Sequence, residues 1–404
     1  MPFESVCVSV QGASHIRKGT PREDYGATAH GPSFDVFAVA DGHGDSSCPR
    51  SDIGSRFACD IAVEHLSSFA QSLRTTMLED GNDTWESKLA GPESDSLLRQ
   101  LVTSIVGHWN EKVSDHFAAN PLTQTERMGC ERYLERYDAG ERIEHIYGTT
   151  LIAGLFTDSY LLLVQQGDGR CVLFDTEGNA TQPIPWDDRC VANVCTSLCD
   201  TDAIQSFRHY LALRRDVSVS ACFAGSDGVE DSFFSMDQLH SFYRELLCRA
   251  AKDGMTALGE HLEAFLPDLS ARGSQDDITV CGLIDPELVA PLVPAFERQN
   301  ELVAAQSQRN RLVDRLQSMA GKLDYLRGRY EKARARAEAS LLLQIDDTAL
   351  QDLEAAEQEL RAYEEQHAAF EQALAETDDL IRALTASDGT VDEPHEEQGD
   401  SHAS

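Results

Sequence analysis

The sequence predicts an α+β fold followed by a helical C-terminal region, and three observations support this. Up to about residue 290, short apolar segments of strand length, rich in β-branched and aromatic residues, are separated by turns containing Gly and Asp. Segments with helical periodicity interrupt these strands. After Pro294, apolar residues recur alternately at intervals of four and three, which is typical of long packed helices.

The strand-like segments are each bounded by turn residues. Thr157, Asp158 and Ser159 separate two of them by a step typical of a hairpin, so we expect antiparallel pairing. The expected strands are residues 34–40, 149–156, 160–165, 171–174, 218–224 and 278–284.

Helices are expected at residues 51–73, 97–117 and 236–265. In the first of these, apolar residues fall roughly on one face, and Ser51 or Asp52 could cap its start. The polar stretches 79–94 and 121–144 are expected to be loops or poorly ordered helix. The region 186–216 shows no clear pattern.

The C-terminal region predicts two helices that pack against each other as a coiled-coil hairpin. Residues 295–340 carry ten Lys and Arg against six Asp and Glu, a net charge of +4, whereas residues 346–385 carry two against twelve, a net charge of −10. Opposite charge favours an antiparallel hairpin over pairing of like helices. We therefore expect domains at residues 1–290 and 295–385, with an acidic, disordered tail at 386–404.

Composition excludes several classes of partner. The formal net charge of −35 disfavours nucleic acid and anionic membranes, since both are bound by clustered cations. No stretch approaches the ~20 apolar residues of a membrane span, and the N-terminal residues do not resemble a signal peptide. The eleven cysteines form no C-x-x-C pair, so we expect reduced thiols and a cytoplasmic location.

Carboxylates stand at or near the ends of several expected strands, and Asp41, Asp168 and Asp227 each precede Gly. Strand ends position catalytic groups well, because the sheet holds the backbone while the loop reaches solvent. Any one of these residues could simply cap a turn, but together they would repel each other unless a hard divalent ion such as Mg²⁺ or Mn²⁺ lay among them. The set comprises Glu23, Asp24, Asp41, Asp168, Asp227, Asp276 and Asp277.

Six separated segments, five of which contain these carboxylates, resemble the type 2C metal-dependent Ser/Thr protein phosphatases, most closely their bacterial-style branch. The resemblance covers about residues 5–285 and is specific because the six motifs agree in type and order. It implies a four-layer αββα sandwich of two antiparallel sheets flanked by helices. The segments are GASHIRKGTPREDY, FAVADGHGDSSCPRSDIGSRFA, GTTLIAGLF, QQGDGRCVLFD, FAGSDGVED and GSQDDITV.

The resemblance also implies roles for the matching residues around the metal ions. Asp41 would bridge two ions, and the carbonyl of Gly42 would bind one of them. Asp227 and Asp276 would ligate the first ion. Asp168 matches a position linked to a third, weaker site in relatives.

The remaining site residues would surround this centre. Glu23 would ligate the second ion directly or through water, with Asp24 beside it, and His43 matches the histidine proposed as general acid. Asp277 stands where the family usually has Asn. Gly19 occupies the position at which relatives often carry a phosphate-binding Arg. The nearby basic residues are His15, Arg17, Lys18 and Arg22, of which we favour Arg17 as the replacement.

The activity implied is hydrolysis of phosphoserine and phosphothreonine in proteins by a metal-bridged hydroxide, with two Mn²⁺ or Mg²⁺ ions and room for a third. The partner would be a phosphoprotein substrate, and the hairpin would serve regulation, docking or self-association. Two alternatives come from other classes: a pseudophosphatase that binds a partner without turnover, and a helical scaffold with an auxiliary phosphatase domain.

Overall fold

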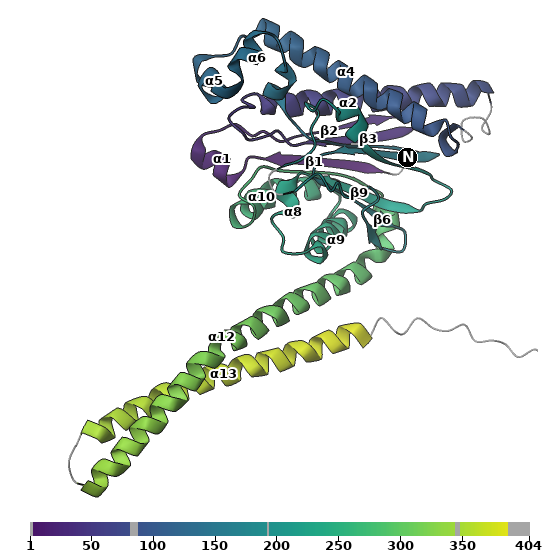
Figure 1. The fold of residues 1–404 in the computed structure, drawn as a ribbon. Coiled ribbons are helices and arrows are strands. Elements are labelled where there is room, and N and C mark those ends of the chain that lie inside the picture. The colour runs from purple at the N-terminus through teal and green to yellow at the C-terminus, as the bar shows by residue number, and fades with distance from the viewer. Residues whose placement is uncertain (1–2, 81–87, 192–193, 344–347, 387–404) are drawn as a thin grey trace, which may run out of the picture. The chain divides into compact units, whose positions relative to one another are not determined.

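The computed structural model describes residues 3–80, 88–191, 194–343 and 348–386 (Figure 1). The chain divides into two compact units, Met1–Glu297 and Arg298–Ser404, which are described separately below. The acidic tail expected at residues 386–404 lies outside the described residues apart from its first residue.

The first unit contains two antiparallel sheets of five strands each. One has the order β1 (Glu4–Val10), β10 (Ile278–Ile284), β9 (Val219–Gly225), β6 (Arg170–Asp175) and β7 (Ala180–Thr181). The other has the order β2 (Tyr25–Gly31), β3 (Phe34–Ala40), β4 (Leu151–Thr157), β5 (Tyr160–Gln166) and β8 (Arg208–Leu213).

Alternating residues of the central strands face two different apolar layers, because successive side chains of a strand point to opposite sides of the sheet. In β3, Val36, Ala38 and Ala40 pack toward helices, while Phe37 and Val39 pack between the two sheets. A third layer separates the other sheet from its own helices. The unit is therefore a four-layer αββα sandwich, as the resemblance implied.

Two pairs of helices form the outer layers. In Figure 1, α2 (Ser51–Asp80) and α4 (Ser94–Ala119) cover one sheet, and α9 (Met236–Asp253) and α10 (Met255–Arg272) cover the other. The shorter helices are α1 (Ala13–Lys18), α5 (Gln124–Gly129), η1 (Glu131–Tyr133), α6 (Leu134–Asp138), η2 (Ile143–Tyr147), α7 (Ala203–Ser206), α8 (Asp227–Glu230), α11 (Pro286–Val289) and η3 (Ala290–Leu292).

Several boundaries differ from those expected. The helix expected over 236–265 is two helices, because Gly254 adopts a φ of +86° that ends α9. The stretch 121–144, expected to be loop or poorly ordered helix, contains short helices, of which α5 begins with a capping box between Thr123 and Glu126. Strands β1, β2, β7 and β8 are not among the expected ranges; their residues are mostly half-buried or exposed, so the apolar signal is weak.

Two of the cysteines face each other across a pair of strands. Cys7 and Cys281 lie directly opposite each other in β1 and β10, with Cα atoms 4.1 Å apart and their sulfur atoms in contact. The sequence did not reveal this contact, because the two residues are 274 positions apart. The other nine cysteines are free.

The second unit consists of most of α12 (Val293–Leu343) together with α13 (Thr348–Ala386). Ion pairs join the two helices in antiparallel order: Arg309 with Asp378, Arg327 with Glu364, Arg329 with Glu359, and Arg336 with Asp352. Side chains at the predicted apolar positions are buried or half-buried, and Met319, Leu323 and Leu326 are almost fully buried. Within the described residues, no helix is both long and apolar enough to cross a membrane.

Candidate functional site

The strand register brings the predicted carboxylates to one edge of the sandwich. β2 begins opposite the end of β3, because Tyr25 pairs with Ala40. β6 and β10 both begin near the end of β9, because Arg170 and Val280 lie opposite Gly225. The segments flanking these strand ends carry Glu23, Asp24, Asp41, Asp168, Asp227, Asp276 and Asp277.

Asp41 and Asp227 lie at the centre of this group. Asp41 follows β3, where its N–H donates to the hydroxyl of Thr150 at 3.0 Å and its carbonyl accepts from the Thr150 N–H at 2.8 Å. Its carboxyl group lies close enough to that of Asp227 for each to perturb the pKa of the other. Burial, followed by the charges of Asp227 and Asp24, raises the pKa of Asp41 well above its usual range, and burial raises the pKa of Asp227 to about 6. A nearby cation would allow both groups to ionise.

Glu23 and Asp24 approach the centre from the segment before β2. The Ser51 hydroxyl donates to Glu23 Oε1 at 2.8 Å, and the Ser55 hydroxyl donates to the Glu23 carbonyl at 2.5 Å, so these two hydroxyl groups orient Glu23. Burial raises the pKa of Glu23 to about 7 and that of Asp24 well above its usual range. Oδ2 of Asp24 is buried and has no hydrogen-bond donor among the described residues.

Asp277 accepts hydrogen bonds from distant backbone N–H groups, a role that the sequence did not reveal. Its Oδ1 accepts from the Gly12 N–H at 2.6 Å, and its Oδ2 accepts from the N–H groups of Glu23 at 2.5 Å and Asp24 at 3.4 Å. A Cβ atom at Gly12 would lie 2.4 Å from the Asp276 carbonyl carbon, so only Gly permits this approach. Asp277 thus clamps the segment that carries two of the predicted ligands.

His15 is the basic side chain that lies among the carboxylates. Its Nε2 is 3.4 Å from Asp276 Oδ1 and 3.8 Å from Glu23 Oε2, and its Nδ1 is 3.0 Å from Asp277 Oδ1. His15, Asp276 and Asp277 present ligand atoms within 4.8 Å of one another, which is a spacing that could hold a metal ion. The sequence offered His15 only as one basic candidate among several near Gly19.

Arg17 lies on the outer side of α1. Its guanidinium donates to Gln275 Oε1 at 2.5 Å, next to Asp276, and its side chain is exposed. The structure therefore places Arg17 at the rim of the carboxylate group, whereas His15 reaches into it.

Gly42 and His43 follow Asp41. A Cβ atom at Gly42 would lie 2.7 Å from the Ser51 carbonyl oxygen and 2.8 Å from that of Glu23, so the backbone packs too closely there for any side chain. The His43 N–H donates to the Gly148 carbonyl, and its ring Nδ1 lies 3.9 Å from Cys195 Sγ. Burial lowers the pKa of His43 to about 4, so the free protein holds a neutral imidazole at pH 7.

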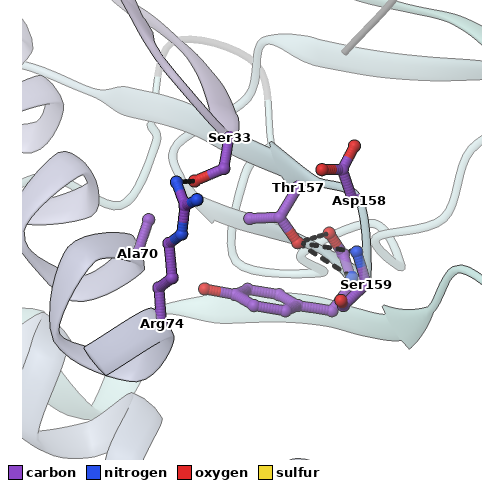
Figure 2. Close-up of a pocket in the computed structure, with 7 residues that line it drawn as sticks. Ser33, Ala70, Arg74, Thr157, Asp158 and Ser159 are labelled. Carbon is purple, nitrogen blue, oxygen red and sulfur yellow. Dashed lines mark hydrogen bonds between the residues drawn. The ribbon is translucent and has the colours of Figure 1, made fainter. Parts of the chain in front are cut away.

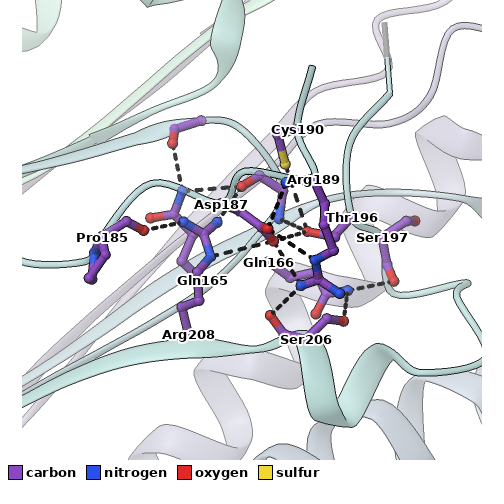
Figure 3. Close-up of polar contacts among 12 residues, drawn as sticks. Gln165, Gln166, Pro185, Asp187, Arg189, Cys190, Thr196, Ser197, Ser206 and Arg208 are labelled. Carbon is purple, nitrogen blue, oxygen red and sulfur yellow. Dashed lines mark hydrogen bonds and ion pairs between the residues drawn. The ribbon is translucent and has the colours of Figure 1, made fainter. Parts of the chain in front are cut away.

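Asp168 stands in the turn between β5 and β6, and a polar network holds this turn (Figure 3). The Gln165 side chain donates to the Gly169 carbonyl at 2.6 Å, the Gly167 N–H donates to the Thr196 hydroxyl at 3.0 Å, and Arg208 donates to the Gly167 carbonyl at 2.6 Å. Burial raises the pKa of Asp168, as do nearby carboxylates.

The same network fixes part of the region 186–216. Asp187 accepts from Arg189 at 2.8 Å and from the Thr196 hydroxyl at 3.3 Å, and Gln166 donates to the Ser197 carbonyl at 2.8 Å and the Ser206 hydroxyl at 3.0 Å (Figure 3). These contacts join residues far apart in sequence, so no local sequence pattern could predict them.

The structure also has a pocket that does not belong to this site (Figure 2). Arg74 from α2 lines it and donates to the hydroxyl of Ser33 at 2.7 Å, while the other wall is the turn between β4 and β5 around Asp158. Ser33 precedes β3, whereas Asp41 follows it, so the pocket and the carboxylates lie at opposite ends of that strand.

The chemistry of the assembled side chains fits hard divalent cations. The converging donors are carboxylate oxygens, several are buried, and burial raises the pKa of Asp24 and Asp41 well above the usual range. Mg²⁺ and Mn²⁺ take oxygen ligands, and binding one would offset the repulsion that the fold otherwise imposes.

Comparison of the chain with models of known protein families identifies one family. The family model described as "Protein phosphatase 2C" matches residues 11–266. No curated protein sequence matches the chain.

Solved structures similar to the chain include three named phosphatases. Stp1 from Staphylococcus aureus is 15% identical with a TM-score of 0.41, covering 70% of this chain and 94% of that one. Serine-threonine phosphatase 2C from Toxoplasma gondii is 15% identical with a TM-score of 0.44 and the same coverage. The PstP catalytic domain, in complex with two manganese ions, is 17% identical with a TM-score of 0.36, covering 70% and 97%.

Proposed function

The chain belongs to the protein phosphatase 2C family, which comprises Ser/Thr protein phosphatases, and on that premise we propose that it hydrolyses phosphoserine and phosphothreonine in proteins with divalent cations. The observation that carries this proposal is the convergence of carboxylates from separate strand ends. The charges of Asp227, Asp24 and Asp276 all act on the Asp41 carboxyl group, which supports a common site for these residues.

The proposed cation ligands are oxygen atoms of this edge of the sandwich. Asp41 and the Gly42 carbonyl would contribute to the central positions, and Asp168 would border a third. When bound, Mn²⁺ or Mg²⁺ would neutralise the phosphate and acidify the attacking water. The full proposed set is Glu23, Asp24, Asp41, Gly42, Asp168, Asp227 and Asp276.

The remaining side chains position these ligands and the substrate. Ser51 orients Glu23, and Asp277 fixes the backbone beside it. His43 would protonate the leaving alkoxide. Because burial keeps its imidazole neutral in the free protein, the negative charge of a bound phosphate would be needed to favour the protonated form. Arg17, at the rim, remains our candidate for binding the phosphate.

The test is Mn²⁺-dependent hydrolysis of p-nitrophenyl phosphate and of a phosphothreonine peptide. We expect turnover that EDTA abolishes and that Asp41→Asn lowers by at least about 100-fold, because the central ligand is lost. Asp158→Asn is the matched control, since Asp158 is a carboxylate at the opposite end of β3. If the intact protein with Mn²⁺ hydrolysed neither substrate, the pseudophosphatase alternative would replace this proposal.

For the helices after residue 295 we propose regulation or docking. Two observations support this role. Ion pairs join α12 and α13 into a hairpin. The apolar residues Leu341, Leu342 and Leu350 near its turn are exposed, as expected for a docking surface. Truncation after residue 311 keeps Phe296, which packs in the first unit. The shortened chain should still hydrolyse p-nitrophenyl phosphate, but it should no longer bind a protein partner or associate with a second copy of itself. The cytoplasmic location stays a prediction.

A further inference from the structure

Exposed apolar side chains gather on the segments that border the carboxylates. Among the described residues of the first unit, every large apolar side chain that is exposed, with the exception of Leu288, lies on one of four such segments. Scattered single apolar residues are normal on a protein surface, but gathering around one site is not. We call this set the apolar collar: Ile16, Met128, Trp186, Val191, Val194 and Phe234.

Two members of the collar lie on α1 and α5, which are at the left in Figure 1, and each adjoins a residue that packs against the site or its loop. Ile16 adjoins His15, whose ring lies 3.4 Å from Asp276. Met128 adjoins Gly129, whose position allows no Cβ because the Ser46 carbonyl oxygen would lie 2.6 Å away. Ser46 follows His43 by three residues, so α5 packs on the loop that carries the proposed general acid.

The segment between β7 and α7 supplies three more members. Val194 precedes Cys195, whose sulfur lies 3.9 Å from the His43 ring, and Val194 and Val191 bond to each other through their backbones. The Arg170 guanidinium stacks on the Trp186 ring, with its carbon 3.9 Å from the ring centroid. Arg170 follows Asp168 by two residues, so Trp186 borders the turn of that proposed ligand.

Phe234 is the most exposed member, with its side chain entirely open to solvent. It lies between α8 and α9, and this loop is bonded to the segment that carries Asp276. The Ser232 hydroxyl and the Ser274 hydroxyl both donate to the Gly228 carbonyl, at 2.7 and 2.9 Å, and Ser274 in turn accepts from the Asp276 N–H at 3.3 Å. Phe234 therefore projects from a loop that is hydrogen-bonded to the segment carrying Asp276.

We propose that the collar binds the residues on either side of the phosphorylated residue, and that these residues are apolar. This inference rests on the proposed function. A phosphorylated side chain that reaches the carboxylates must bring its own backbone across the collar. Asp45, Asp231 and Asp276 add negative charge at this edge, which disfavours acidic flanking residues. The expected occupant is a phosphopeptide with Leu, Ile or Phe next to the phosphorylated Ser or Thr.

The measurement is binding of fluorescent peptides to the full-length protein with Mn²⁺, by anisotropy. Each peptide carries a non-hydrolysable phosphonate in place of phosphothreonine, so binding is read whether or not the protein turns substrate over. Three peptides differ only in their flanks: Leu and Phe, Ser and Gly, or Asp and Glu. We expect the apolar peptide to bind about tenfold more tightly than the Ser/Gly peptide, and the acidic peptide to bind most weakly.

The variants identify the surface. Phe234→Ser and Met128→Ser should each reduce the preference for the apolar peptide several-fold, whereas Leu288→Ser, which removes an exposed apolar residue outside the collar, should leave it unchanged. Equal affinity for the apolar and Ser/Gly peptides, or equal effects of Phe234→Ser and Leu288→Ser, would overturn the inference. So would a Phe234-dependent dimer in light scattering, or Phe234-dependent binding to phosphatidylcholine vesicles. Failure to hydrolyse p-nitrophenyl phosphate would remove the proposed function but not the measured preference.

Discussion

Replacing Glu126 with Gln should make the protein less stable at neutral pH and have a smaller effect in acid. Glu126 accepts two bonds from the Arg50 guanidinium, at 2.7 and 3.2 Å, and one from the Thr123 N–H at 2.6 Å. Arg50 also donates to the Asn120 carbonyl and the Tyr147 hydroxyl, so this ion pair fastens residues 120–147 to the start of α2.

The magnitude follows from the pKa of the carboxyl group. The hydrogen bond from Arg50, as the largest cause, lowers the pKa of Glu126 from its usual 4.5 to about 2. At 1.36 kcal/mol per pKa unit, the shift corresponds to about 3 kcal/mol, and partial exposure to solvent reduces this to about 2 kcal/mol. Because the folded-state pKa is depressed, the stabilisation is complete above about pH 4.5 and is lost as the pH falls toward 2.

The assay is urea unfolding of the wild type and Glu126→Gln at pH 7, 4.5 and 3. The difference in the free energy of unfolding should be about 2 kcal/mol at pH 7 and roughly half of that at pH 3. Glu131→Gln, a substitution at an exposed neighbour, serves as the control and should show no such trend. A difference between wild type and Glu126→Gln that stayed constant from pH 7 to pH 3 would refute the reasoning.

Three further changes test other parts of the fold. Gly54→Ala should lower the free energy of unfolding by roughly 3 kcal/mol or more in urea titrations, because its Cβ would lie 1.9 Å from the Tyr147 carbonyl oxygen; a wild-type midpoint would disprove this. Asp41→Asn should raise the metal-free melting temperature by a few degrees and abolish the rise caused by Mn²⁺, as read by thermal shift. In the hairpin, unfolding followed by circular dichroism should show that Leu326→Ala lowers the free energy of unfolding by about 3 kcal/mol and Arg336→Ala by less than about 1 kcal/mol. Equal losses would contradict a helix interface stabilised by apolar burial.

The central strands could be predicted because their local signal matches their environment. Strand β10 was expected at its observed bounds, since Ile278 to Ile284 is buried on both faces and forms a continuous apolar run. Strand β8 was missed because it pairs only with β5 and carries polar and half-buried residues such as Arg208 and His209. Propensity gives little signal for a strand whose place is set by its neighbour.

The residues of the candidate site likewise divide into those that the sequence could predict and those that it could not. Asp41 and Asp227 could be proposed because each follows an apolar strand and precedes Gly, a pattern visible within a few residues. The clamp by Asp277 and the position of His15 could not, because both depend on α1 and β10 meeting across more than 250 residues of chain. Only tertiary structure reveals which of several nearby basic residues faces the carboxylates.

An asparagine would be a poor replacement for Asp277 in this chain. Both of its side-chain oxygens receive backbone N–H groups, those of Gly12, Glu23 and Asp24. An asparagine of the same shape has one acceptor oxygen and one NH₂ group, and the NH₂ group would have to face an N–H group. The change would be isosteric yet would set two donors against each other, so the backbone around Gly12, Glu23 and Asp24 fits an aspartate at residue 277 and not an asparagine.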